Sequence, residues 1–245
     1  MGKMKNVLIT GGAGGIGSAC ARVFAENGYN VGISYMESEK EALLLKAELL
    51  EKGVDCEAFY CDVSSRDDVE SMFSQFEARL GNVDVLINNA GIAQQKLFLD
   101  ITLWEWNRMI DTNLTGVFNT CQCALRNMVY NKSGSIVNIS SIWGISGASC
   151  EAHYSASKAA VIALTKALAK EYGPSNIRVN AIAPGVIDTK MNAHLDEGDI
   201  EALAQNTALG RIGTPREAAE AAYFLASEKA AFITGQVLTI DGGFV

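Results

Sequence analysis

Three polar residues in the second half of the chain could together transfer a proton. Tyr154 precedes Lys158 by four residues, and Ser141 lies thirteen residues before Tyr154. Four residues make about one helical turn, so a helix would place the phenol and the ammonium group side by side. The positive charge would favour the phenolate, and so a phenol that exchanges its proton near neutral pH. We therefore predict an active site within residues 141–158.

A glycine-rich segment, T-G-G-A-G-G-I-G at residues 10–17, could hold a phosphate group. Residues 5–10 form an apolar run typical of a strand, and residues 15–27 have helical periodicity that stops at Gly28. Glycines let the backbone turn tightly and approach a pyrophosphate, which would then lie on the N-terminus of the helix. A dinucleotide ligand is the interpretation that this position in the chain favours.

Strand-like and helix-like segments alternate along the whole chain. Strands are predicted at 5–10, 30–35, 56–60, 83–88, 134–140, 177–182 and 236–240, and helices at 15–27, 38–52, 65–80, 103–130, 153–172 and 215–227. This alternation requires a parallel sheet with long right-handed crossovers, and nearly continuous apolar strands indicate burial on both faces. We predict an α/β, doubly wound Rossmann fold with a seven-stranded parallel sheet and helices on both faces.

The predicted fold occupies residues 1–245 as a single dinucleotide-binding domain. Residues 183–214 are too many for a plain connection in a compact domain. We expect helical pieces there, and a lid over the substrate at about 186–213.

Composition limits the partners. The chain has 245 residues, 49% hydrophobic and 20% charged, with a formal net charge of −8, which argues against a nucleic-acid partner. Six cysteines without a C-x-x-C pair, and only two histidines, predict reduced thiols and no metal site. No apolar run is long enough to span a membrane and no signal-peptide core is present, so we expect a cytoplasmic protein.

Taken together, these motifs resemble the short-chain dehydrogenase/reductase family. The resemblance covers nearly the whole chain and rests, in order, on T-G-x-x-x-G-x-G at 10–17, N-N-A-G at 88–91, Ser141, Tyr154-x-x-x-Lys158 and Pro184-Gly185. The loop also satisfies the T-G-x-x-G-x-x-G pattern of an extended branch of the family. A chain of 245 residues leaves no room for the added substrate domain of that branch.

The resemblance implies a catalytic tetrad of Asn113, Ser141, Tyr154 and Lys158. Tyr154 would donate a proton to the substrate oxygen and Ser141 would give a second hydrogen bond. Lys158 would bind the nicotinamide ribose, and Asn113 would hold a water molecule that relays protons to it. Ser140 is the rival of Ser141, but the gap to Tyr154 in relatives favours Ser141.

Other residues near this segment have weaker claims. We expect His153 at the pocket edge or surface and His194, in the lid, to face solvent. Cys150 could line the pocket but has no partner for nucleophilic chemistry. Trp143, two residues past Ser141, is the aromatic residue most suited to contact a substrate.

The family pattern also implies the residues that contact a nicotinamide dinucleotide. They are Gly11, Gly15, Ile16, Gly17, Tyr35, Asp62, Val63, Asn89, Ala90, Gly91, Tyr154, Lys158, Pro184, Gly185, Ile187 and Thr189.

The choice between NADP(H) and NAD(H) depends on the residues at the end of the second predicted strand and in the glycine loop. The aspartate of NAD-preferring relatives falls at Tyr35, and the basic residues of NADP-preferring relatives fall at Met36 and Gly14. Glu37 could hold a ribose hydroxyl, whereas Ser34, Ser38 and Lys40 could hold a phosphate instead. We expect NADP(H) and keep NAD(H) as the alternative.

The overall pattern, including residues 234–243, is most similar to the 3-oxoacyl-acyl-carrier-protein reductases of the family, which implies reduction of a ketone to a secondary alcohol. That similarity also implies a homotetramer or homodimer, and a substrate that could be bound to a carrier protein through residues such as Arg126 or Lys132. The alternatives are a reductase of another ketone, whether a small molecule, sugar, steroid or protein-bound group, and a cofactor-binding sensor without turnover.

Overall fold

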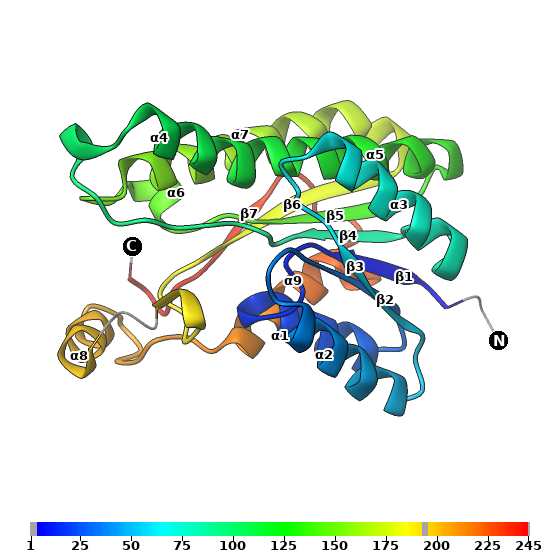
Figure 1. Cartoon of the computed structure of the whole chain (residues 1–245), viewed down its shortest axis with the longest axis horizontal. Helices are drawn as coiled ribbons and strands as arrows, with labels where there is room; N and C mark the ends of the chain where they lie inside the picture. Colours follow the sequence, from blue (N-terminus) through cyan, green and yellow to red (C-terminus); the bar gives the residue numbers. More distant parts are fainter. Residues whose placement is uncertain (1–3, 193–195, 245) are drawn as a thin grey trace.

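One parallel sheet organises the protein (Figure 1). The computed structural model describes residues 4–192 and 196–244. The strands lie in the order β3-β2-β1-β4-β5-β6-β7, and all neighbours pair in parallel. They are β1 (Asn6–Ile9), β2 (Asn30–Tyr35), β3 (Cys56–Tyr60), β4 (Val85–Asn88), β5 (Gly134–Ile139), β6 (Ile177–Pro184) and β7 (Val237–Ile240). The predicted doubly wound sheet is confirmed, and its order reverses between β1 and β4, where such folds bind ligands.

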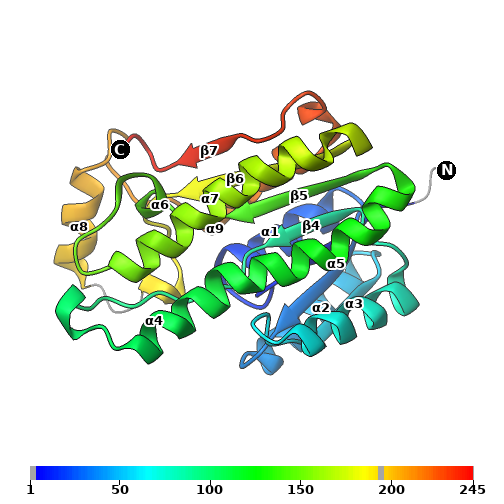
Figure 2. The same cartoon turned by 90° about the horizontal axis from the view of Figure 1, so that it is seen from above.

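Helices cover both faces of this sheet (Figures 1 and 2). The helices α1, α2 and α9 pack on one face, and α3, α5 and α7 pack on the other. The bounds are α1 (Gly15–Glu26), α2 (Glu39–Glu51), α3 (Arg66–Leu80), α4 (Leu103–Ile110), α5 (Gly116–Asn131), α6 (Trp143–Ser146), α7 (Ala152–Tyr172), α8 (Glu197–Gln205) and α9 (Pro215–Ala226).

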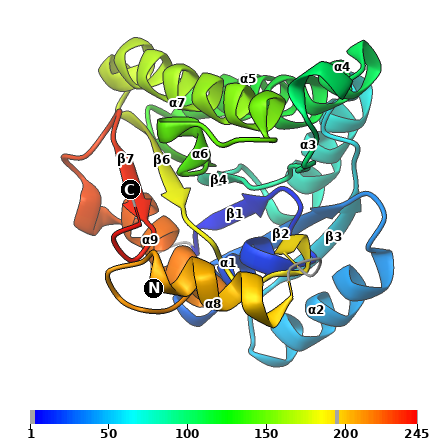
Figure 3. The same cartoon turned by 90° about the vertical axis from the view of Figure 1, so that its left-hand side faces the viewer.

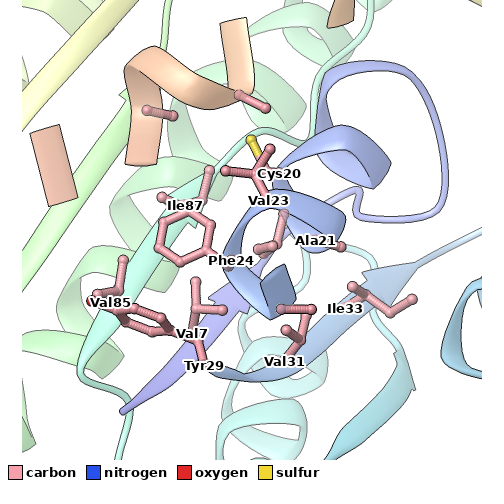
Figure 4. Close-up of a cluster of buried hydrophobic side chains, with 14 of the residues drawn as sticks. Val7, Cys20, Ala21, Val23, Phe24, Tyr29, Val31, Ile33, Val85 and Ile87 are labelled. Carbon is pink, nitrogen blue, oxygen red and sulfur yellow. The ribbon is translucent and has the colours of Figure 1, made fainter. Parts of the chain in front are cut away.

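Burial on both faces explains the continuous apolar runs of the strands. Val7 and Ile9 of β1 point into the cluster under α1 and α9, whereas Leu8 points into the cluster on the other face. Figure 4 shows the first cluster, in which the rings of Phe24 and Tyr29 meet edge to face with centroids 5.1 Å apart. Burying a side chain of this size contributes about 1.5–3 kcal/mol, so these two clusters fix both helix layers.

Local sequence signals determine where two of the helices begin. At the start of α9, Thr214 and Glu217 form a capping box, and Pro215 occupies the first helical position. At the start of α4, Thr102 and Glu105 form the same reciprocal pair of hydrogen bonds. Each box satisfies backbone N–H groups that have no partner within the helix.

The long helix predicted over 103–130 is interrupted. Residues Asp111–Thr115 form a π-helical turn between α4 and α5. Asn113 lies in this turn and is fully buried. Because a π turn accommodates an extra residue and re-aims the side chains around it, such turns often occur at functional sites.

The segment after β6 contains the helical pieces that were expected. A short 3-10 turn spans Lys190–Asn192, and α8 follows, beyond the carboxyl ends of the strands (Figures 2 and 3). His194 lies outside the described residues. No helix within residues 4–192 and 196–244 is both long enough and apolar enough to cross a membrane.

Candidate active site

Hydrogen bonds from the end of β4 hold the glycine loop closed. The Thr10 hydroxyl accepts from the backbone N–H groups of Asn89, at 3.0 Å, and Ala90, at 3.1 Å. The Asn89 amide donates to the carbonyl oxygens of Thr10 and Gly11 at 3.0 and 2.9 Å. Asn89, predicted to contact the cofactor, therefore also shapes the loop that would hold it.

The N-terminus of α1 is open toward a cavity. Its N-cap residue, Gly14, has no side chain with which to cap the first N–H groups. Gly15 and Ile16 line a cavity of about 350 Å³ that extends to Thr189. Unpaired N–H groups and the positive end of the helix dipole make this a suitable site for a pyrophosphate.

Two cavities form a continuous trough over the carboxyl ends of the strands. The first runs from the glycine loop to Tyr154 and Lys158. The second, of about 500 Å³, reaches Asp62 and Val63, and the two share several lining residues, among them Gly91. Every predicted cofactor contact except Gly17 lines one cavity or the other. The trough and its helix N-terminus fit a dinucleotide.

Gly17 lines neither cavity and packs against the glycine loop beneath the trough. A Cβ atom at this position would lie 2.3 Å from the Gly11 carbonyl oxygen and 2.6 Å from the Asn89 amide nitrogen. Only a glycine lets the first turn of α1 approach the loop so closely. A Cβ at Gly14 would meet no atom within 4 Å.

Tyr154 and Lys158 lie together on α7, with exposed fractions of 8% and 5%. The Lys158 Nζ atom is 5.7 Å from the centroid of the Tyr154 ring and donates to the Ile139 carbonyl oxygen at 2.9 Å. Burial raises the pKa of Tyr154 to about 12, although its hydrogen bond with Ser141 acts to lower that pKa. Burial also lowers the pKa of Lys158 to about 8.

These pKa shifts differ from the expectation that the lysine would make the phenol more acidic. Desolvation disfavours the phenolate, so burial dominates the pKa of Tyr154. At neutral pH the tyrosine therefore holds its proton, and Lys158 remains mostly charged. A protonated phenol next to a cation is the form that can donate to a carbonyl oxygen.

The two serines after β5 have different partners. The Ser140 hydroxyl donates to the Lys158 carbonyl oxygen at 2.9 Å, which ties the strand end to α7. The Ser141 hydroxyl accepts from the Trp143 backbone N–H at 3.1 Å and bonds the Tyr154 phenol. Ser141, and not Ser140, thus shares a hydrogen bond with the tyrosine.

The Asn113 amide is bound to protein groups at both ends. Its oxygen accepts from the Ile92 backbone N–H at 2.8 Å, and its nitrogen donates to the Ile92 carbonyl oxygen at 2.9 Å and to the Ser157 hydroxyl at 3.1 Å. The π turn thereby fixes the segment after β4 against α7. The relay of protons through a water molecule remains a prediction.

Of the two positions expected for His153, pocket edge or surface, the surface position is wrong. Its exposed fraction is 0%, and its Nε2 atom lies 3.1 Å from the Gln94 side-chain oxygen. The prediction rested on His153 pointing to a different face of the helix from Tyr154, and the segment after β4 covers that face of α7. Burial lowers the pKa of His153, so the ring is neutral at pH 7.

A third cavity, of about 250 Å³, adjoins Ser141 and Tyr154 and could hold a substrate. Trp143 lines it, as expected, and so do Gln94, Gln95 and Glu151, which the sequence did not single out. Only two residues separate the N-N-A-G segment from the two glutamines, and this proximity was the signal that could have identified them. Cys150 is exposed.

The two residues suggested for carrier-protein contact lie elsewhere. Arg126 lies in the second half of α5, and Lys132 follows the last residue of that helix. The C-terminal end of α5 lies beside the start of β5 (Figure 2), whereas the trough lies over the carboxyl ends of the strands. Arg126 pairs with Glu70 at 3.8 Å.

A seven-stranded parallel sheet with a glycine loop after β1 and a Ser–Tyr–Lys cluster beside a dinucleotide-shaped trough defines a class of oxidoreductases that use a nicotinamide cofactor. The chain belongs to the short-chain dehydrogenase/reductase family. The family model that matches residues 11–245 is described as "Enoyl-(Acyl carrier protein) reductase".

Several relatives are similar over almost their whole length, and each is described as a 3-oxoacyl-[acyl-carrier-protein] reductase. The Chlamydia muridarum protein is 44% identical over 98% of this chain and 96% of its own. The Thermotoga maritima protein is 42% identical over 98% of each chain. The Staphylococcus aureus protein is 41% identical over 98% of this chain and 97% of its own.

The glycine loop gives a first prediction. Gly17→Ala should abolish measurable NADPH binding and lower the melting temperature, because its Cβ would clash with the Gly11 carbonyl oxygen. In the matched variant Gly14→Ala the added Cβ lies in open space, so NADPH binding and the melting temperature should both stay unchanged. Fluorescence titration with NADPH and thermal unfolding measure the two effects. Equal behaviour of the two variants would disprove the steric argument.

The buried lysine gives a second prediction. Its folded pKa of about 8 lies below the ordinary 10.5, so the unfolded chain binds this proton more tightly. The resulting destabilisation is complete below pH 8 and disappears as the pH rises toward 10.5. Lys158→Met should therefore raise the free energy of unfolding at pH 7 by about 1–3 kcal/mol, after allowance for the lost Ile139 hydrogen bond.

Urea unfolding of both proteins at pH 7 and pH 9.5 checks this second prediction, and the difference should shrink at the higher pH. Lys166→Met removes an exposed lysine from the same helix and should change stability by no more than about 0.5 kcal/mol at either pH. A Lys158→Met protein less stable than the wild type at pH 7 would contradict the argument.

Proposed function

We propose that the protein reduces the ketone of a 3-oxoacyl thioester to a secondary alcohol with NADPH as hydride donor, as in the carrier-protein reductases of fatty acid biosynthesis. The observation that carries this proposal is that Ser141 and Tyr154, with Lys158 beside the tyrosine, line both the cofactor trough and the 250 Å³ cavity. The described activity of three relatives at 41–44% identity gives independent support.

A nicotinamide cofactor held in the trough would supply a hydride to the carbonyl carbon. Negative charge then develops on the carbonyl oxygen, and the chain must stabilise and neutralise it. The Ser141 and Tyr154 hydroxyls would both hydrogen-bond this oxygen and hold the carbonyl in a single orientation. Tyr154 would then give its proton to the oxygen, because the phenol is protonated at neutral pH.

The other members of the predicted tetrad would support this transfer. Lys158 would hold a cofactor ribose hydroxyl, and its positive charge would stabilise the phenolate that remains after Tyr154 has donated. Asn113 would keep the Ile92 segment against α7, so that the space beside Lys158 stays open to a proton-relaying water molecule. Residues 186–213 would cover the substrate as a lid.

The end of β2 supports NADP(H) as the cofactor. Tyr35 and Met36 line both cavities, at the place where a ribose 2′-substituent would lie, and neither side chain carries a carboxylate. Glu37 lines only the second cavity and is exposed. Ser38, exposed on the first cavity, offers a hydroxyl to a phosphate group.

We further propose a homotetramer, or else a homodimer, which would act in the cytoplasm on a substrate held by an acyl carrier protein. Large apolar side chains that stay exposed support self-association, notably Leu99 at 95% and Phe232 at 104%. Six free cysteines support a reducing compartment.

The proton donor gives a third prediction. Tyr154→Phe should lower kcat for acetoacetyl thioester reduction by at least about 100-fold, because the phenol proton is lost. The Kd for NADPH should stay within about twofold. Loss of NADPH absorbance measures turnover, and a crotonyl thioester measured in parallel tests the enoyl reduction named by the family model. Wild-type turnover of the crotonyl thioester alone would overturn the proposed ketone reduction.

Cofactor choice gives a fourth prediction. The wild type should bind NADPH more tightly than NADH, and Gly14→Arg should strengthen NADPH binding about tenfold or more, because an arginine fits the open space there and can pair with the 2′-phosphate. Gly14→Gln, of similar length but uncharged, should show little gain. Tighter wild-type binding of NADH, or an equal gain for both cofactors in Gly14→Arg, would reverse the assignment.

A further inference from the structure

A hydrogen-bonded chain behind the substrate cavity includes a buried histidine that the proposed chemistry does not use. Its members are His153, Gln94 and Glu105. The Gln94 amide nitrogen donates to the Glu105 carboxylate at 2.8 Å, and the Gln94 oxygen lies 3.1 Å from His153 Nε2. Gln94 lines the 250 Å³ cavity together with Ser141 and Tyr154.

The chemistry of the partners fixes the direction of each hydrogen bond. A carboxylate only accepts, so the Gln94 nitrogen must face Glu105 and the Gln94 oxygen must face the histidine. An amide oxygen also only accepts, so His153 must donate through an Nε2–H group. Burial keeps the ring neutral, and its proton therefore resides on Nε2.

Glu105 is itself held firmly. Its carboxylate accepts from Lys96 Nζ at 2.8 Å and from the Thr102 backbone N–H at 2.8 Å, and it caps α4. These bonds hold the pKa of Glu105 well below its usual range, and the bond from Lys96 has the largest effect. Glu105 therefore stays a carboxylate. Gln94 is thus fixed at both ends of its amide, by a carboxylate on one side and a neutral imidazole on the other.

Within residues 4–192 and 196–244 the Gln94 amide nitrogen donates to Glu105 alone, which leaves one N–H group of Gln94 available for a ligand. The amide nitrogen carries two protons, and Glu105 receives one of them. A 3-oxoacyl thioester has a second carbonyl, that of the thioester. One methylene group separates it from the ketone carbonyl that Ser141 and Tyr154 would hold. We propose that Gln94 binds the thioester carbonyl of the substrate, and that His153 and Glu105 are positioning residues that hold the Gln94 amide in the required orientation. This inference rests on the proposed function.

Kinetic constants for an acetoacetyl thioester test the proposal. Gln94→Ala should raise KM about tenfold, the effect of one lost hydrogen bond, with kcat within about twofold, because the contact is present before and during hydride transfer. His153→Leu should raise KM by a similar factor, since the amide can then rotate. The double variant should be no worse than Gln94→Ala alone.

Two further variants separate positioning from general stability. His153→Gln carries an N–H group at the place of Nε2 and should restore KM to within about threefold of the wild type. Gln95→Ala removes the neighbouring glutamine, which lines the same cavity without bonding to His153, and should raise KM less than Gln94→Ala. The NADPH Kd should be unchanged in all of them.

The outcomes distinguish this inference from the proposed function. A wild-type protein that does not turn over the thioester would remove the proposed function and this inference together. Normal wild-type turnover with an unchanged KM in Gln94→Ala, or with additive effects in the double variant, would remove the inference alone. Recovery of KM by His153→Gln but not by His153→Leu is the expected result.

Discussion

The burial of one ammonium group constrains the whole neighbourhood of the site. Lys158 is 5% exposed, and among the described residues its Nζ atom donates one hydrogen bond, to the Ile139 carbonyl oxygen. The residues that pack against Lys158 must therefore approach it closely without large side chains. A Cβ at Gly91 would lie 3.4 Å from Nζ, and a Cβ at Gly144 would lie 2.8 Å from the Lys158 carbonyl carbon. Gly91 thus leaves room beside the buried cation, whereas Gly144 lets α6 pack closely against the backbone of α7. The buried cation is destabilising alone but suited to hold a ribose and a phenolate.

A buried polar network keeps the elements around this cation in register. The Asn88 amide donates to Asn138 at 2.8 Å, and Asn138 donates to Thr165 of α7 at 2.8 Å. Thr120 of α5 donates to the Asn88 oxygen at 2.7 Å. Because buried polar groups are costly when unpaired, any shift of β4 against β5, or of α7 against both, would break several of these bonds together. The network thus fixes the strand ends from which the N-N-A-G segment and Ser141 extend.

The features that could be predicted from sequence are those with local physical causes. Apolar runs and glycine stops located all seven strands, and the spacing of Tyr154 and Lys158 located them on one helix. The burial of His153 could not be predicted, because it depends on a segment about sixty residues earlier in the chain. The π turn at Asn113 also has no local signature, since its side chain bonds Ile92 across a loop. Cofactor preference depends on how side chains at the end of β2 point, which periodicity does not encode.

The acidity of the protein makes its phosphate binding depend on the backbone. The formal net charge is −8, and the glycine loop, residues 10–17, has no charged residue of its own. The positive potential for a pyrophosphate must come from the uncapped N–H groups and the dipole of α1. Backbone N–H groups act only at short range. The direction in which these N–H groups point is set by the hydrogen bonds of Thr10 and Asn89 and by the absence of a side chain at Gly17. The affinity for the cofactor should therefore depend strongly on the geometry of this loop.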